Sequence, residues 1–314
     1  MKVLITDDLG DIESLERVIE ELRGKVEITY RPGIGRKELL REVSKYEVLT
    51  VRSRVKVDRE VMEAGERLRV IITTTHGLDH IDLEEAKRRG IEVINIARQA
   101  NSVAELVIGL IFCLARGICI GDREIKRGRW VKYELIGMEV EGKTLGVIGF
   151  GRIGSKVAEK GRVLGMRVLA YDVRISEDRK RVAESLGIEL VDLETLLRES
   201  DFITIHVPKT RETEKLLSTR EFELMKRGVF LINASRGEVV DEAEMLRAIE
   251  EGKLGGIAVD VYSRDPFTDP VLRKLIENSR VLATPHIGGQ TKEARVKTIE
   301  ALGEILKRIS ERVG

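Results

Sequence analysis

Residues 144–154 read Thr-Leu-Gly-Val-Ile-Gly-Phe-Gly-Arg-Ile-Gly, and this stretch decides the fold of the second half of the chain. It begins as an apolar run and ends with glycines at the spacing Gly-x-Gly-x-x-Gly. Apolar residues at helical spacing follow, and a second apolar run at residues 167–171 ends on Asp172. A strand, a glycine turn, a helix, a strand and an acid in this order are typical of a dinucleotide-binding βαβ unit.

Each part of this motif has a physical reason. Gly149 permits the tight turn, Gly151 lets the backbone approach a pyrophosphate, and Gly154 lets the helix pack closely on the strand. The start of the helix offers N–H groups and a positive dipole end to phosphate. Asp172 ends the second strand, where its carboxylate can accept hydrogen bonds from both ribose hydroxyls. Its charge would repel a 2′-phosphate, which favours NAD over NADP, although Arg174 nearby moderates that preference.

The composition limits the possible functions. The 314 residues suffice for two domains of ordinary size, and an apolar content of 42% suffices for their cores. Positive and negative charges are mixed, with a net charge of +1, and no basic block indicates nucleic acid binding. Glu105 and Arg116 interrupt the most apolar region, residues 103–120, so we expect a buried helix there and no membrane span.

Three further features of the sequence concern the location of the protein in the cell, metal binding and the growth temperature of its source. The first seven residues lack the length and the cleavage site of a signal peptide, so we expect a cytoplasmic protein. Cys113 and Cys119 do not have the spacing of a metal site, and no metal is expected. The chain has only two glutamines beside abundant Glu, Lys and Arg, which favours a thermophilic source.

Short apolar runs alternate with amphipathic helices through the first hundred residues. We expect strands at residues 3–6, 26–30, 48–51, 70–74 and 91–96, with helices between them, including residues 57–68. Strands that alternate with helices indicate a parallel sheet with crossover helices. This half has no glycine fingerprint, so it is predicted to be a smaller doubly wound domain that does not bind the dinucleotide.

The alternation continues on both sides of the glycine motif. We expect a long helix at residues 102–116, a helix at 122–129, and strands at 188–191, 202–207, 229–233, 256–261 and 281–283. Val- and Ile-rich runs without alternation suit strands that are buried on both faces. A final amphipathic helix at residues 291–313 could return to the first domain and make it discontinuous.

Charged side chains follow three strands of the second domain, where ligands bind in an open α/β sheet. These are Arg236, Asp265 and His286. Hydride transfer between a nicotinamide and a carbonyl carbon needs a proton for the oxygen, and a histidine can deliver it near neutral pH. A carboxylate on the far ring nitrogen would fix the tautomer, and a guanidinium would hold the substrate carboxylate. Singly, each residue has an ordinary structural explanation; together they predict a catalytic set.

Several stretches resemble the D-isomer-specific 2-hydroxyacid dehydrogenases over essentially the whole chain. They are residues 101–110, 149–154, 233–237 with Asp241, 258–262 with Asp265-Pro266, and Thr284-Pro285-His286. The resemblance implies an α/β protein of two doubly wound parallel-sheet domains with a cleft between them. Residues 1–98 and 291–314 would form a flavodoxin-like substrate domain, and residues 99–290 a Rossmann NAD domain. It also implies a homodimer built around the helix after Asn101.

The resemblance also implies roles for individual residues. The catalytic set would be Arg236, Asp265 and His286, with Asp260 in contact with the nicotinamide amide. His206, which ends a strand before Pro208, would border the adenosine. The cofactor-binding candidates are Gly149, Gly151, Arg152, Ile153, Gly154, Asp172, His206, Val207, Pro208, Thr213, Ala234, Asp260 and Gly288. The substrate-binding candidates are Arg52, Ser53, Thr75, His76 and Gly77.

Within the family, Val51-Arg52-Ser53-Arg54 and residues 57–70 are most similar to short-type D-3-phosphoglycerate dehydrogenases. Three departures stand out. Asp265 replaces the usual Glu, Thr75-His76-Gly77 replaces a Gly-x-Gly loop, and Thr73 stands where phosphoglycerate enzymes often have Arg. The first expected substrate pair is D-3-phosphoglycerate and 3-phosphohydroxypyruvate. Reduction of glyoxylate or hydroxypyruvate is the alternative, and an NADH-binding, corepressor-like module is an alternative of another class.

Overall fold

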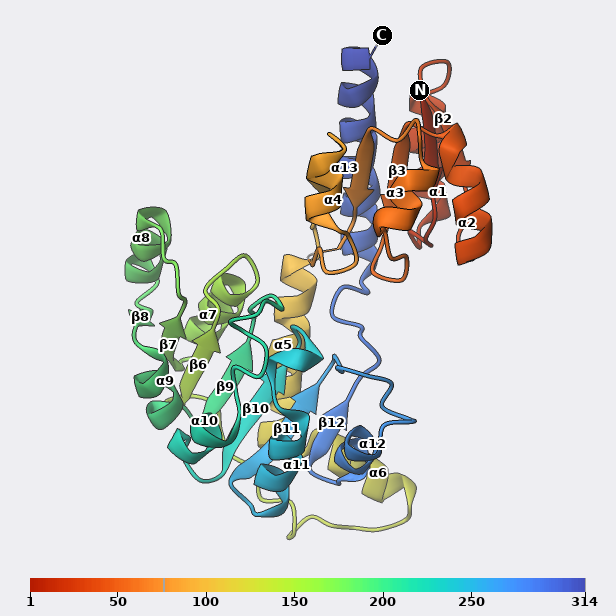
Figure 1. The fold of residues 1–314 in the computed structure, drawn as a ribbon. Helices are drawn as coiled ribbons and strands as arrows, with labels where there is room; N and C mark the ends of the chain where they lie inside the picture. Colours follow the sequence, from red (N-terminus) through yellow and green to blue (C-terminus); the bar gives the residue numbers. More distant parts are fainter. Residues whose placement is uncertain (76, 314) are drawn as a thin grey trace. The chain divides into compact units, whose positions relative to one another are not determined.

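The computed structural model describes residues 1–75 and 77–313. The chain divides into two compact units (Figure 1). The first unit comprises Met1–Gln99 and Gln290–Gly314, and the second comprises Ala100–Gly289. The last helix, blue in Figure 1, thus belongs with the first hundred residues, so the first unit is discontinuous in sequence.

The first unit is built on a five-stranded parallel sheet, counted over the described residues. Its strands are β1 (Lys2–Ile5), β2 (Glu27–Tyr30), β3 (Val48–Val51), β4 (Val70–Thr73) and β5 (Glu92–Asn95). They lie in the order β2-β1-β3-β4-β5, which is the flavodoxin-like order predicted for this unit. The chain leaves β1 for β2 on one side and returns to β3 on the other, so the switch point lies between β1 and β3.

Helices cover both faces of this sheet. They are α1 (Ile12–Glu21), α2 (Arg36–Glu42), α3 (Arg59–Ala64), α4 (Leu83–Arg88) and α13 (Lys292–Val313), with a 3₁₀ turn η1 (Val43–Lys45). Asp11, Asp58 and Asp82 begin α1, α3 and α4 by accepting a hydrogen bond from a backbone N–H of the first turn. The α3 helix is shorter than the predicted 57–68, because Asp58 caps it and Gly65 ends it.

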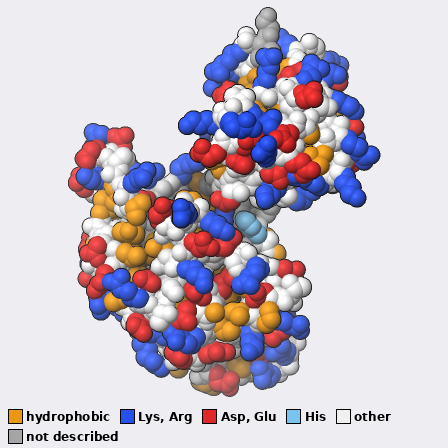
Figure 2. All heavy atoms as spheres, in the orientation of Figure 1, with side chains coloured by type: hydrophobic (Ala, Val, Ile, Leu, Met, Phe, Trp, Pro, Cys, Tyr) orange, Lys and Arg blue, Asp and Glu red, His pale blue; other side chains and the backbone are white. Residues whose placement is uncertain are grey.

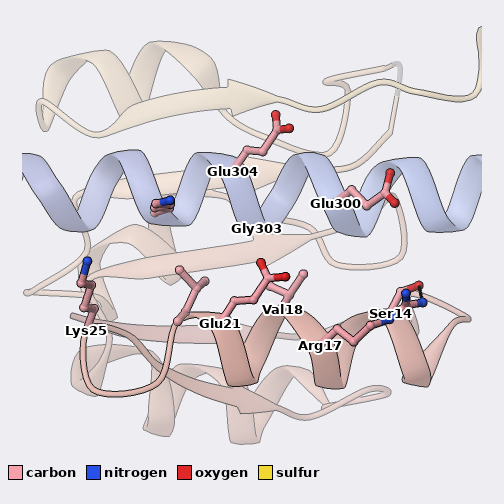
Figure 3. Close-up of a pocket in the computed structure, with 10 residues that line it drawn as sticks. Ser14, Arg17, Val18, Glu21, Lys25, Glu300, Gly303 and Glu304 are labelled. Atoms are coloured by element: carbon pink, nitrogen blue, oxygen red, sulfur yellow. Dashed lines mark hydrogen bonds between the residues drawn. The ribbon is translucent and has the colours of Figure 1, made fainter.

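A groove of about 590 Å³ runs between α1 and α13 (Figure 3). Gly303 allows the two helices to approach, since a Cβ there would lie 3.0 Å from a methyl group of Val18. Both cationic and acidic side chains line the groove; they are Arg17, Glu21, Lys25, Glu300, Glu304 and Lys307. The described lining residues include none of the predicted site residues, and the mixed charge gives the groove no clear ligand preference.

The second unit is built on a parallel sheet that has seven strands among the described residues. They are β6 (Thr144–Ile148), β7 (Arg167–Tyr171), β8 (Glu189–Leu190), β9 (Phe202–Ile205), β10 (Val229–Asn233), β11 (Leu254–Val259) and β12 (Val281–Ala283). The order β12-β11-β10-β9-β6-β7-β8 is that of a Rossmann sheet with an added edge strand. Every residue of β6 and β9 is buried, as predicted for strands covered on both faces.

The helices of the second unit differ from the predictions in detail. They are α5 (Ala100–Arg116), α6 (Ile118–Lys126), α7 (Gly154–Val163), α8 (Glu177–Ser185), α9 (Leu193–Glu199), α10 (Thr219–Leu224), α11 (Glu242–Glu250) and α12 (Pro270–Glu277), with a 3₁₀ turn η2 (Gly237–Val239). The α6 helix begins at Ile118 instead of residue 122, because left-handed Gly117 ends the preceding helix. The α8 and α12 helices were not predicted; charged residues dominate α8, whereas α12 is a short amphipathic helix that begins at Pro270.

The strand β11 begins and ends two residues earlier than predicted, which changes the position of Asp260. The strand predicted at 256–261 is β11, Leu254–Val259, so Asp260 follows the strand instead of lying within it.

Figure 2 shows acidic and basic side chains interspersed over the visible face of both units, without an extended basic patch there. In the part of the chain that the structure describes, no single helix is long and apolar enough to cross a membrane; α5 and α6 pass that test only as a pair bent by 65°.

Candidate active site

The glycine turn after β6 has the geometry that its sequence predicts. Gly149 has a left-handed backbone (φ 94°), and a Cβ there would lie 2.7 Å from the carbonyl of His206. A Cβ on Gly154 would lie 1.9 Å from the carbonyl oxygen of Gly149, so the first turn of α7 packs directly on the strand end. A Cβ on Gly151 would meet no atom within 4 Å. The open side of the turn is therefore at Gly151, where a pyrophosphate would approach.

Asp172 closes this turn from the end of β7. Its Oδ2 accepts the backbone N–H of Phe150 at 2.9 Å, and its Oδ1 accepts that of Arg174 at 3.0 Å. The Arg179 guanidinium lies 3.7 Å from Oδ2, and the Asp172 side chain is 17% exposed. Each carboxylate oxygen keeps a second lone pair for a ligand hydroxyl. The turn, the open space at Gly151 and this acid fit a dinucleotide such as NAD.

His206 lies at the neighbouring strand end and stays neutral. Its Nε2 lies 2.9 Å from the Thr204 hydroxyl, and its buried Nδ1 has no hydrogen-bond partner among the described residues. Burial lowers the pKa of His206 to about 3, so the ring carries no charge at physiological pH. Thr213 fixes the loop that follows, since its hydroxyl donates to the Pro208 carbonyl at 2.6 Å.

Arg236 stands on a tight turn after β10. Asn233 holds this turn: its side-chain oxygen accepts the Ser235 N–H at 3.1 Å, and its amide donates to the Arg236 carbonyl at 2.9 Å. A Cβ on Gly237 would lie 2.1 Å from the backbone of Tyr262 and Ser263. The half-buried Arg236 turn therefore packs directly against the segment that follows β11.

His286 stands on a strained segment after β12. It has a left-handed backbone (φ 55°), which is uncommon for a residue with a Cβ, and its side chain is exposed. Asp260 holds the residues on either side of it. Oδ1 of Asp260 accepts the Thr284 hydroxyl at 2.6 Å and the Ile287 N–H at 2.8 Å, and Oδ2 accepts the Gly288 N–H at 2.8 Å.

Asp260 is almost fully buried, with 1% of its surface exposed, and it makes these bonds from the end of the neighbouring strand. Tyr262 adds a further bond, because its hydroxyl donates to the Thr284 carbonyl at 3.0 Å. Burial raises the pKa of that hydroxyl to about 12, so it remains a donor. Sequence reasoning gave Asp260 a contact with the nicotinamide and did not find this bracing of the His286 segment.

Asp265 lies further along the same segment, in an exposed turn. Its Oδ1 accepts the Phe267 N–H at 2.8 Å, and its carbonyl accepts the Asp269 N–H at 3.0 Å. The structure thus gives Asp265 a turn-forming role. Its pairing with His286 remains a prediction.

The other candidates of this unit lie on exposed or half-buried positions around the same edge: Arg152, Ile153, Val207, Pro208 and Ala234. Gly288 is buried against Asp260.

In the first unit, the loop after β4 is fixed by side chains from three directions. The Thr73 hydroxyl lies 3.0 Å from both the Thr75 hydroxyl and His80 Nε2, and the Thr75 hydroxyl donates to the Gly77 carbonyl. The amides of Asn95 and Gln99 donate to the carbonyls of Thr75 and Thr74, both at 2.6 Å. Thr73 is fully buried, so its side chain faces the interior and not the loop surface. His76 lies outside the described residues.

Arg52 and Ser53 follow β3 at the same edge, and Arg54 completes the loop. Three groups of the Arg54 guanidinium are engaged: Nε lies 3.0 Å from Asp7 Oδ1, Nη2 donates to the Thr6 carbonyl, and Nη1 donates to that of Ile34. Ser53 is exposed, and Arg52 is half-buried. Arg54 is therefore a structural residue that joins the loops after β1 and β3, which sequence alone did not separate from Arg52.

Together, the Rossmann sheet, the glycine turn and Asp172 define a dinucleotide-binding α/β unit. Residues 108–288 match the family described as D-isomer specific 2-hydroxyacid dehydrogenase, NAD binding domain. The chain belongs to the D-isomer-specific 2-hydroxyacid dehydrogenase family.

Two relatives and one solved structure illustrate this kinship. A D-3-phosphoglycerate dehydrogenase of Archaeoglobus fulgidus is 43% identical over 298 residues, which is 94% of this chain and 55% of the relative. A hydroxypyruvate reductase of Thermotoga maritima is 41% identical over 274 residues, which is 87% of this chain and 88% of the relative. The D-lactate dehydrogenase of Aquifex aeolicus, crystallised with NAD and lactic acid, is 32% identical with a TM-score of 0.85, covering 99% and 96% of the two chains. The chain spans about half the length of the D-3-phosphoglycerate dehydrogenases that it matches.

Proposed function

We propose that this protein is an NAD-dependent oxidoreductase that interconverts a D-2-hydroxy acid and its 2-oxo acid. The observation that carries the proposal is the exposed His286 at a strained backbone position, held by buried Asp260 beside the Arg236 turn. Strain of this kind persists where the surrounding structure enforces it, and it is concentrated at functional sites. Bound NAD would supply or accept the hydride.

Residues of the second unit would bind the substrate carboxylate, transfer the proton and position the histidine. Arg236 offers a planar guanidinium that can bind a carboxylate through two hydrogen bonds. His286 can give a proton to the carbonyl oxygen during reduction and remove it again during oxidation. Asp260 would act as a positioning residue, because it holds the Thr284 hydroxyl before His286 and the N–H groups of Ile287 and Gly288 after it. Asp265 would pair with the far ring nitrogen of His286.

The first unit would bind the rest of the substrate. Thr75 and Gly77, in the loop after β4, would present backbone N–H groups to the substrate carboxylate. We propose D-3-phosphoglycerate and 3-phosphohydroxypyruvate as the substrate pair, supported by the relatives that carry that name. The alternative is reduction of hydroxypyruvate or glyoxylate. It is favoured by fully buried Thr73, whose hydroxyl is bonded to Thr75 and His80 and is not available to a phosphate.

The test follows NADH oxidation at 340 nm with 3-phosphohydroxypyruvate, hydroxypyruvate and glyoxylate in parallel. We expect turnover of at least one of them, with a preference of tenfold or more in kcat/KM for the phosphorylated acid. His286→Ala should lower the rate by about 10²–10⁴-fold, since it removes the general acid. NADH binding without turnover of any 2-oxo acid would instead indicate a corepressor-like module and contradict the proposal.

We also propose that the protein is a homodimer and that it functions in the cytoplasm. Large apolar side chains are exposed along α6 and the segment after it: Ile118, Ile125, Trp130, Tyr133 and Ile136, of which the last three are 77–89% exposed. Several large apolar side chains exposed within one short stretch of the chain favour a protein–protein interface there. Light scattering should give twice the mass of the 35.4 kDa chain, and Ile136→Asp with Tyr133→Asp should shift it toward one chain.

The thermophilic origin is a further part of the proposal. It is supported by ion-pair networks in which one residue binds several partners, such as Glu85 with Arg88 and Arg89, and Arg36 with Asp58 and Glu60. A thermal midpoint well above the mesophile range of about 45–65 °C is expected. A midpoint near 50 °C would contradict it.

A further inference from the structure

Glu242 is a buried acid to which the proposed reaction assigns no role. It is the first residue of α11, and 9% of its surface is exposed. Both oxygens of its carboxylate bind one residue of another segment: Oε1 accepts the Ser263 N–H at 3.0 Å, and Oε2 accepts the Ser263 hydroxyl. Arg264 and Asp269 act on this carboxyl with opposite signs, and they form an ion pair with each other at 3.0 Å.

The burial of Glu242 costs free energy that the helix itself does not require. Burial raises the pKa of its carboxyl, and the two hydrogen bonds from Ser263 oppose that rise. The helix is already capped, because Asp241 accepts the N–H groups of Ala243 and Glu244. A buried charge is tolerated where hydrogen bonds compensate it, and acids with a shifted pKa are concentrated at functional sites. The contact with Ser263 is therefore the feature to be explained.

Ser263 belongs to the segment after β11, which is held from two sides. On one side, Asp260 and Tyr262 bond to the segment that carries His286. On the other side, Glu242 holds Ser263 through both its N–H and its hydroxyl. The segment after β11 thus lies between α11 and the histidine segment, with hydrogen bonds to both.

The stretch that carries Glu242 is itself fixed to the sheet domain. Its start packs on the segment after β11, since a Cβ on Gly237 would lie 2.1 Å from the Ser263 nitrogen. Its end is bonded to another loop, because the Asp241 N–H donates to the Leu217 carbonyl at 2.8 Å. Glu242 follows directly, so its carboxylate holds Ser263 from a rigid base.

Asp265 lies two residues beyond this contact, and its own bonds stay within its turn. Its Oδ1 accepts the Phe267 N–H at 2.8 Å, and the neighbouring Arg264 pairs with Asp269 of the same turn. Neither bond ties the start of the turn to the rest of the unit. The two bonds from Ser263 to α11 are therefore what fixes the start of the turn that carries Asp265.

We propose that Glu242 is a positioning residue for the reaction: by holding Ser263, it sets where the Asp265 carboxylate lies relative to His286. The inference rests on the proposed dehydrogenase function, in which Asp265 pairs with the far ring nitrogen of His286. Glu242 acts through the segment that it holds and does not itself exchange a proton in the reaction.

The kinetic test removes the contact in steps. Glu242→Ala deletes both acceptors, and a displacement of about 1 Å at a catalytic group can cost on the order of 10²-fold in rate. We expect kcat to fall by about 10–100-fold, with a smaller change in KM. Glu242→Gln should retain most of the rate, since its oxygen can accept the Ser263 N–H and its amide can donate to the Ser263 hydroxyl. Ser263→Ala keeps the N–H bond, so its kcat should lie between those of the two Glu242 variants.

Glu244→Ala is the matched control on the same turn of α11. Glu244 accepts the Thr219 hydroxyl at 2.8 Å and pairs with Arg247, so its contacts lie away from the segment after β11. This variant should lower the thermal midpoint and leave kcat unchanged. A loss of stability without loss of kcat in Glu242→Ala as well would give Glu242 a merely structural role and overturn the inference.

A measurement that needs no turnover separates this inference from the function on which it rests. The chain has four histidines, so NMR can follow each ring through a pH titration of the whole protein, and His286→Gln identifies the signal of His286. A carboxylate partner favours the protonated ring. Glu242→Ala should therefore move the titration midpoint of His286 to lower pH, in the same direction as Asp265→Asn.

The double variant shows whether Glu242 acts through Asp265. In the Asp265→Asn background, Glu242→Ala should have little further effect on the His286 midpoint, because both changes break one pair. That result supports the inference even if the protein turns over no 2-oxo acid, which would refute the dehydrogenase function alone. An unchanged His286 midpoint in Glu242→Ala, or an equal shift in both backgrounds, overturns the inference whether or not the protein is a dehydrogenase.

Discussion

The carboxyl edges of the two sheets differ in the side chains that hold their loops. In the second unit, acidic side chains hold the turns by accepting backbone N–H groups, as Asp172 does from Phe150 and Asp260 does from Gly288. In the first unit, Asp7 and Asp8 also accept backbone N–H groups, and arginines hold the same loops by donating to backbone carbonyls, as Arg54 does to Thr6. The first edge is therefore held by both acids and arginines, whereas the second presents a glycine turn and an exposed histidine.

The difference shows that strand order alone does not set the chemistry of an edge. Both sheets are parallel and open, and both place their loops at a switch point. What differs is the residue type that follows each strand and whether it pairs with main chain or with another side chain. The following variants test how far the edge of the second unit depends on its acids, its glycine turn and its buried histidine.

The largest effect is expected at the brace of the His286 segment. Asp260→Ala removes the acceptor of two backbone N–H groups and of the Thr284 hydroxyl, so His286 is no longer held in its left-handed conformation. A displacement of about 1 Å at such a group can cost on the order of 10²-fold in rate, so kcat should fall by that factor with a smaller change in KM.

Asp192→Ala is the matched control for that variant. Asp192 also accepts a backbone N–H, from Thr195 at the start of α9, but it lies away from the histidine segment. It should lower the thermal midpoint while changing kcat by less than about twofold. If Asp260→Ala lowers stability and leaves kcat unchanged, the bracing of His286 has no part in the reaction.

The glycine turn gives the second prediction. Gly149→Ala places a Cβ 2.7 Å from the His206 carbonyl on a left-handed backbone, and it should lower the free energy of unfolding by about 1–3 kcal/mol. Gly151→Ala meets no atom within 4 Å, so it should fold normally but weaken NADH binding by about tenfold. Thermal unfolding and NADH fluorescence titration separate the two. Equal NADH affinity in wild type and Gly151→Ala would mean that no pyrophosphate lies against this residue.

The third prediction concerns the neutral histidine beside that turn. His206 has a folded-state pKa of about 3, below its ordinary value near 6.5, so the unfolded chain binds the proton first. Its contribution to stability is fully present above pH 6.5 and is lost as the pH falls toward 3, by up to about 1.4 kcal/mol per pH unit. His206→Gln should flatten this decline. Urea unfolding at pH 7, 5.5 and 4.5 measures it, and parallel curves for the two proteins would contradict the buried, neutral state.

The smallest effect is expected at a surface network on the second unit. Arg167 contacts both Glu189 and Glu199 at 2.6 Å, and these hydrogen bonds raise its pKa. Arg167→Ala should lower the free energy of unfolding by about 1 kcal/mol or less at low salt, and by less still in 1 M salt. Arg181→Ala, which breaks one helical pair with Asp178, should have a smaller effect. Equal thermal midpoints for both variants would mean that the network is no stronger than a single pair.

Much of the fold was predictable from local pattern. The strands of both sheets and the turn at Gly149–Gly154 follow from apolar runs and from glycines at fixed spacing, which act over a few residues. The α8 helix was missed because charged residues dominate it, the short amphipathic helix α12 was missed as well, and β11 ends two residues before its predicted end. That small shift matters, because Asp260 then lies in a loop and can brace the neighbouring strand end.

The candidate site was predictable only in part. Arg236, Asp265 and His286 could be chosen because each follows a strand, and parallel strands end at one edge. The Asp260 brace, the Tyr262 bond to Thr284 and the Asn95 and Gln99 bonds to the Thr75 loop gave no such signal. These contacts depend on which side chains the folded loops bring within 3 Å of a backbone group.

The sequence by itself determined the class of the protein: two doubly wound α/β units, one with a dinucleotide turn and an acid after its second strand. These features are encoded by short-range backbone preferences and by periodic burial. The tertiary structure decided which charged residues are structural and which are available. Arg52 and Arg54 look equivalent in the chain, yet only the side chain of Arg54 forms an ion pair with Asp7, and Arg295 reaches Gly10 across 285 residues. Pairing over such separations depends on how the strands and the last helix assemble, which no local pattern records.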